Sequence, residues 1–271
     1  MRSHFGWKVA ALTSAALVTL LLVSHRRPAA AEKRLETVRG NPVPVLVELF
    51  TSEGCSSCPP ADIVLEQLQK EQPVEGGLVI ALSEHVDYWN HLGWADPFSS
   101  RGFSDRQRGY GRAFGLDSVY TPQMVVNGRA EFLGSDRERA EAVISRAARA
   151  PHADVRVTSL VDTGMAGHLE VRVSGLPSNR SGDPVDVLLA ITENNLRSSV
   201  ARGENAGRHL GHTAVVRRLT SLGVASPGHP IAADPTLKFD RAWKRKDLSA
   251  VVFAQEHNSG HVLGAAEVSL K

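Results

Sequence analysis

The spacing of hydrophobic and polar residues changes character near residue 150. Before that point, short uninterrupted apolar runs typical of buried strands alternate with stretches whose apolar residues recur at helical spacing. After it, apolar and polar residues alternate one by one, as in strands with one buried face. The pattern predicts an α/β domain over residues 32–150, followed by a smaller antiparallel β-sandwich domain over residues 151–271.

The first predicted elements form a β-α-β unit. An apolar run at 45–50 predicts one strand, and the run at 78–83 predicts a second. Between them, apolar residues at i, i+3, i+4 and i+7 predict a helix over 59–71, and Pro59 suits its first turn, where no N–H is needed.

The remaining elements follow from local signals. A weaker helical pattern covers 103–114, and a strand at 124–126 runs into Asn127-Gly128, a hairpin signal. Ser135 and Glu138 form a capping-box pattern that starts a helix ending near 150. About six strands are then expected, at 155–157, 169–173, 185–192, 213–219, 250–256 and 262–270.

The only two cysteines of the chain, Cys55 and Cys58, lie between the first strand and the first helix. A CxxC pair at the first turn of a β-α-β unit is the thioredoxin-type arrangement. The free N–H groups and partial positive charge of a helix N-terminus favour a thiolate over a thiol. We therefore favour a redox pair in which Cys55 attacks and Cys58 resolves the mixed disulfide.

Two other interpretations of this pair remain open. One is a structural disulfide, although closing so short a loop removes little chain entropy. The other is a metal site, which needs ligands beyond two thiolates, and the chain has no second CxxC. Glu53 would disfavour a nearby thiolate, so the direction of electron flow stays open.

A segment rich in polar and aromatic residues covers 85–102. Its rings either pack beneath a long loop or, with Glu53, His85, Asp87 and Trp89, line a cleft beside Cys55. A metal site using His85, Asp87 and His91 is a third interpretation, but the spacing matches no structural zinc pattern. For the glycine-bounded loop at 202–208 we favour a connecting role over a contact with the first domain or an anion site.

The first 31 residues have the features of a secretory signal. Arg2 and Lys8 precede an uncharged run over 9–23 that is shorter than the ~20 residues of a spanning helix, and a small-residue cleavage site ends at Ala31. Without the four cationic residues of this segment, 27 Lys+Arg face 29 Asp+Glu, so charge favours neither nucleic acid nor an anionic membrane as partner. A periplasmic or secreted protein without stable membrane insertion is expected, and such compartments preserve disulfides.

Four motifs carry a resemblance to a known family. The sequences VELFTSEGCSSCPPAD at 47–62, HVDYWNHLGWADPF at 85–98, YTPQMVVNG at 120–128 and GENAG at 203–207 resemble the domain-of-unknown-function family number 1223, a group of secreted bacterial proteins. The resemblance implies a thioredoxin-like fold and presents Cys55, Cys58 and the Thr121-Pro122 pair as the redox centre. Two departures alter charge near the cleft: Glu53 where the family more often has glutamine, and Asn90 where it more often has aspartate.

These observations predict an exported thiol–disulfide oxidoreductase. Its substrate would be a thiol or disulfide on a protein or small molecule, with Thr121 and Pro122 shaping the groove and with no metal or organic cofactor. The alternative is a non-catalytic binding or assembly protein that keeps a thioredoxin-like scaffold with a structural disulfide.

Overall fold

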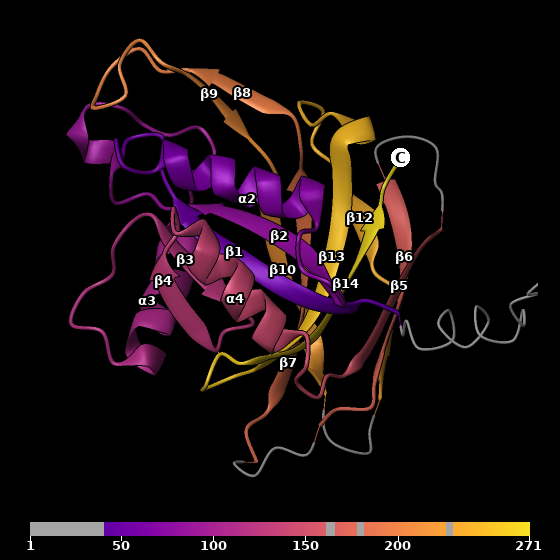
Figure 1. Ribbon diagram of the computed structural model, residues 1–271. Helices are drawn as coiled ribbons and strands as arrows, with labels where there is room; N and C mark the ends of the chain where they lie inside the picture. Colours follow the sequence, from indigo (N-terminus) through magenta and orange to yellow (C-terminus); the bar gives the residue numbers. More distant parts are fainter. Residues whose placement is uncertain (1–40, 161–165, 178–181, 226–229) are drawn as a thin grey trace, which may run out of the picture. The chain divides into compact units, whose positions relative to one another are not determined.

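The structure is a computed structural model that describes residues 41–160, 166–177, 182–225 and 230–271 (Figure 1). The predicted signal segment, residues 1–31, lies outside the described residues. None of the helices within the described ranges is long and apolar enough to cross a membrane.

The main element is a mixed eight-stranded sheet with the order β14-β13-β7-β10-β2-β1-β3-β4. Strands β1 and β2 run parallel, β3 joins β1 antiparallel, and β4 joins β3 through a turn at Asn127 and Gly128, both at positive φ. The predicted hairpin signal is thereby confirmed. The strands are β1 (Val43–Thr51), β2 (Gly77–His85), β3 (Gln123–Val126), β4 (Ala130–Leu133), β7 (Val185–Glu193), β10 (Val215–Ala225), β13 (Leu248–Glu256) and β14 (Val262–Ser269).

The sheet runs through both halves of the chain. Strand β10 lies beside β2, with Val215 opposite Ser83, and β7, β13 and β14 continue the sheet as antiparallel neighbours. Strands expected in a separate sandwich thus extend the sheet that begins with β1, and they cross the boundary predicted near residue 151. The α/β class is confirmed.

Three α-helices cover the sheet within the described residues: α2 (Pro59–Glu71), α3 (Arg101–Phe114) and α4 (Arg137–Ala147). Apolar residues of α2 and α4 share one core cluster with alternate residues of β1 and β2, whereas α3 packs against the other set through Phe103 and Tyr110. Successive side chains of a strand point to opposite faces of the sheet, so α2 and α4 cover one face and α3 covers the other. The N-cap of α4 is Asp136, which accepts from the Arg139 amide at 2.9 Å, and not Ser135 as the capping-box pattern predicted.

A smaller antiparallel sheet packs against β7 and β13. It contains β5 (Asp154–Leu160), β6 (Ala166–Ser174), β11 (Ile231–Ala233) and β12 (Thr236–Lys238). Its buried Leu169, Val171 and Val173 share a core cluster with alternate residues of β7 and β13. Two further strands, β8 (Leu196–Ser199) and β9 (His209–His212), pair only with each other, and this hairpin lies beside α2 (Figure 1).

Candidate functional site

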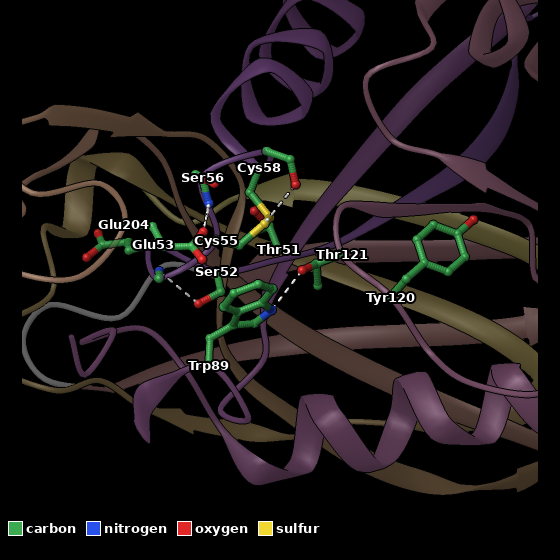
Figure 2. Close-up of a disulfide and its surroundings, with 12 residues drawn as sticks. Thr51, Ser52, Glu53, Cys55, Ser56, Cys58, Trp89, Tyr120, Thr121 and Glu204 are labelled. Carbon is green, nitrogen blue, oxygen red and sulfur yellow. Dashed lines mark hydrogen bonds between the residues drawn. A yellow bond between two sulfur atoms is a disulfide. The ribbon is translucent and has the colours of Figure 1, made fainter. Parts of the chain in front are cut away.

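The two cysteines form a disulfide in the turn that joins β1 to α2 (Figure 2). Their Cα atoms are 5.4 Å apart, the Cys55 amide donates to Ser52, and the Cys58 amide donates to Cys55. Cys58 is the N-cap of α2. The predicted position of the CxxC pair, between a strand and a helix, is confirmed.

The end of α2 offers less to a thiolate than the sequence suggested. Pro59 and Pro60 have no N–H, and the amides of Ala61 and Asp62 both donate to the Cys58 carbonyl. Only the helix dipole remains to favour negative charge there. On the other cysteine, Cys55 Sγ lies 3.3 Å from the Ser57 hydroxyl, which is able to donate to a thiolate.

Both cysteines are fully buried at 0% exposure, and the loop at 200–208 between β8 and β9 contacts their turn. Asn205 Nδ2 donates to the carbonyls of Glu53 and Cys55, each at 2.9 Å, and the Ser56 amide donates to Glu204 Oε2 at 3.0 Å. The connecting role favoured for this loop was therefore incomplete, and the alternative of a contact with the first half of the chain is correct.

Glu53 points into a buried polar cluster and not into open solvent. Its carboxylate accepts from Trp94 Nε1 at 2.8 Å and contacts His212 Nε2 at 3.0 Å. Burial alone raises the pKa of Glu53, but hydrogen bonds from His212, Ser198 and Trp94 outweigh it and hold the pKa below its ordinary value. An ionised carboxylate therefore lies two residues before Cys55.

His85 belongs to the same cluster. Its Nδ1 lies 2.7 Å from Asp96 Oδ2, which also accepts from the Glu53 amide at 2.8 Å. The His85 ring stands edge-on to His212, with centroids 4.9 Å apart. The pKa of Asp96 is held low by His85 and by backbone donors, although burial opposes this. His85 therefore contacts the cysteine turn indirectly, through Asp96 and the Glu53 amide.

Asp87 and Trp89 contact different partners. Asp87 accepts from the Ser104 hydroxyl at 2.5 Å and so fastens its loop to α3. Trp89 Nε1 donates to Thr121 Oγ1 at 2.8 Å, and a side chain at Gly54 would meet Trp89 Cβ at 3.0 Å. Trp89 thus packs against the cysteine turn, and Figure 2 shows its ring and Thr121 beside the disulfide.

Pro122 follows Thr121 through a cis peptide bond and begins the approach to β3. It is buried, and its carbonyl accepts from the Gly134 amide at 3.0 Å. Of the residues singled out from the sequence, Cys55, Cys58, Trp89 and Thr121 are grouped at the turn, whereas Asp87 faces α3.

Sequence reasoning gave no individual role to four polar residues at this site: Asp62, Asp96, Asn205 and His212. Asp62 lies in the first turn of α2 and accepts from Thr51 Oγ1 at 2.9 Å. Burial is the main cause that raises the pKa of Asp62 to about 7. The GENAG motif was the one available signal for Asn205, whereas nothing local marks His212 as a partner of Glu53.

The fold and site define an α/β protein with a covered CxxC disulfide at a strand-to-helix turn. Residues 46–255 match the family described as a protein of unknown function, DUF1223, and the chain belongs to this family. A search among curated proteins found no match.

Two solved structures are similar over most of the chain. Protein AGR_C_4864 from Agrobacterium tumefaciens aligns with a TM-score of 0.66 and 29% sequence identity, covering 86% of this chain and 96% of that one. HBP35 of Porphyromonas gingivalis aligns with a TM-score of 0.57 and 17% identity, covering 85% and 76% of the two chains. The second likeness concerns the fold alone.

Proposed function

We propose that the protein is an exported thiol–disulfide oxidoreductase that acts through Cys55 and Cys58. The observation that carries the proposal is the disulfide itself, which joins residues only three positions apart at the start of α2. So short a loop removes little entropy from the unfolded chain, so stabilisation is a weak reason for this bond. A short-range disulfide in such a turn is suited to reversible exchange.

The arrangement of the first half supports a thioredoxin-like scaffold. Parallel β1 and β2 flank α2, and the antiparallel pair β3 and β4 precedes α4, which packs with α2 on one face. This order brings the turn after β1 close to Thr121, which precedes β3 (Figure 2). A substrate groove between these two segments is part of the proposal.

The exchange conserves atoms and electrons. A thiolate of a substrate dithiol attacks Cys55 Sγ, the bond between the cysteines breaks, and Cys58 leaves as a thiolate that takes up a proton. The second substrate thiol, after losing its proton, attacks the substrate sulfur of the mixed disulfide and releases Cys55 as a thiolate, which is protonated. The substrate has then lost two electrons and two protons to the protein, and an external disulfide compound restores the pair.

In the reverse direction, Cys55 attacks a substrate disulfide and Cys58 resolves the intermediate. Both directions move protons near the turn, and Asp62, with its pKa of about 7, changes protonation state near neutral pH. Its amide donates to the Cys58 carbonyl at 3.1 Å, which places it in the same helical turn.

One observation favours a second candidate, a binding or assembly protein with a structural disulfide. Both cysteines are fully buried, and Asn205 and Glu204 bind the backbone of their turn, so an incoming thiolate does not reach them in this conformation. That candidate predicts that the Cys55→Ser, Cys58→Ser double variant keeps its partner in an affinity pulldown.

The test is a redox titration of the folded protein in glutathione buffers, with alkylation and mass measurement. We expect reversible conversion between unmodified protein and protein carrying two alkyl groups, because the chain has two cysteines. Cys55→Ser should abolish exchange with a disulfide peptide, and Cys58→Ser should accumulate glutathione on Cys55. Ser56→Ala, an exposed residue of the same turn, is the matched control.

Reduction that occurs only after denaturant unfolds the protein would reject the oxidoreductase. Unchanged pulldown of a partner by the double serine variant would then support the second candidate.

A further inference from the structure

The hairpin of β8 and β9 is built as an extension of the fold and not as part of its core. Its strands form their own two-stranded sheet between the end of β7 and the start of β10. None of the residues over 196–212, all of which the structure describes, belongs to the four apolar core clusters, and Val200 and Leu210 are the buried apolar side chains of this segment. An isolated two-stranded hairpin is marginally stable in water, so its position depends on other contacts.

Polar contacts with the cysteine turn hold the tip of the hairpin. Asn205, at 0% exposure, donates to the carbonyls of Glu53 and Cys55, and Glu204 accepts from the Ser56 amide. At the base, His212 contacts the Glu53 carboxylate at 3.0 Å. Water is able to replace hydrogen bonds of this kind at small net cost. Opening would also expose buried apolar surface of Val200 and Leu210.

Residues with positive φ flank the two strands. Asn195 (φ 58°) comes immediately before β8, and Ala214 (φ 48°) follows β9. Between the two ends, Asn194 Oδ1 accepts from the Ala214 amide at 2.8 Å and from the Thr213 hydroxyl at 2.9 Å. The base of the hairpin is therefore tied together, and backbone rotation at its ends would move the tip as one piece.

We propose that the loop over 200–208 is a cap that closes the Cys55–Cys58 disulfide against thiols and opens by lifting from the cysteine turn. This regulation rests on the proposed exchange activity at the same pair. An attacking thiolate must approach the sulfur, and access governs the rate of the step. With the cap closed both cysteines are buried, so reduction proceeds only through the open form.

The experiment measures how fast dithiothreitol reduces the disulfide in the full chain under native conditions, followed by rapid alkylation and mass measurement. Asn205→Asp keeps the size of the side chain but turns a negative oxygen toward the two carbonyls that the amide now contacts. We expect reduction to be about tenfold faster or more, since each lost hydrogen bond to a buried acceptor favours opening. Glu204→Ala removes one exposed bond and should accelerate reduction by only about two- to threefold.

Arg202→Gln is the matched control, because it changes the net charge by the same amount in the same exposed loop. It should be reduced at the wild-type rate. In the wild-type protein the rate should level off at high dithiothreitol, where cap opening becomes limiting, whereas the rate for Asn205→Asp should keep rising over a wider range. Chemical denaturation of each variant shows whether the change is confined to the cap.

Equal reduction rates for wild type and Asn205→Asp, both linear in dithiothreitol, would overturn the cap. Faster reduction of Asn205→Asp without any exchange with a disulfide peptide would leave the cap standing and reject the oxidoreductase. If the wild-type protein exchanges with the peptide, and neither Asn205→Asp nor Glu204→Ala changes the rate of reduction, the oxidoreductase would stand and the cap would be rejected.

Discussion

A buried cluster of charged residues between α3 and the sheet predicts how the stability of the protein changes with pH. Arg106 donates to Glu48 Oε1 through Nε at 2.7 Å and through Nη2 at 2.5 Å, and its Nε lies 3.3 Å from Glu84 Oε1. Both glutamates are fully buried. One guanidinium faces two carboxyl groups, so burial, together with the charge of Glu48, raises the pKa of Glu84 well above its ordinary value of 4.5.

Glu84→Gln removes the proton uptake that accompanies folding at pH values between the ordinary pKa of a glutamate and the raised pKa of Glu84. A group whose pKa is higher in the folded than in the unfolded state stabilises fully below the unfolded pKa, and this stability is lost as pH rises toward the folded pKa. Glutamine is neutral at every pH, so the variant does not lose this contribution to stability as the pH rises. Relative to wild type, the variant should gain about 1.4 kcal/mol per pH unit above 4.5, until the pH reaches the folded pKa of Glu84.

The assay is urea unfolding of wild type and Glu84→Gln at several pH values between about 5 and 7, where the difference in unfolding free energy should change by up to about 3 kcal/mol. Any imperfect fit of the amide adds a constant that does not depend on pH, so the slope is the diagnostic quantity. Glu66→Gln, at an exposed position of α2, controls for the loss of a carboxyl group. A difference that stays flat over this range would refute a protonated Glu84.

Three further predictions test other parts of the structure by chemical denaturation. Gly128→Ala should cost about 3 kcal/mol or more, because the new Cβ would lie 1.8 Å from the Gly260 carbonyl oxygen at a backbone φ of 59°. Asp136→Ala should cost about 1 kcal/mol through the lost N-cap of α4, whereas Ser135→Ala should cost much less. Asp62→Asn should gain stability relative to wild type as pH rises from its ordinary pKa of 3.8 and should level off above about 7; no change in slope near 7 would contradict the raised pKa.

Local patterns were enough to place the cysteine turn. The apolar run that predicted the strand at 45–50 lies within β1, and the helical spacing after Pro59 predicted the bounds of α2. These signals are local because a strand buried on both faces and an amphipathic helix each follow from a few consecutive residues. The N-cap of α4 was predicted one residue too early. Ser135 and Asp136 are both good N-cap residues, so the sequence alone does not decide between them.

The hydrophobic pattern of the sequence does not show which strands pair when they lie far apart in the chain. The run at 213–219 predicted a strand, but it does not show that Val215 pairs with Ser83 of the first half. The contact of Asn205 with the Cys55 carbonyl likewise joins residues 150 positions apart. A buried amide in a glycine-bounded loop reads as an ordinary turn until its acceptors are known.

Burial and reactivity are linked at this site through the backbone of the turn. Asn205 binds the Cys55 carbonyl, so any change in this segment on reduction alters the free energy of cap closure. Coupling between two such equilibria is reciprocal: if the closed cap prefers the oxidised turn by a given factor, opening favours reduction by that same factor. A substrate that lifts Asn205 from the turn therefore both exposes the disulfide and changes its tendency to be reduced. A buried disulfide is then compatible with exchange chemistry, provided that the substrate makes contacts that replace those of the cap.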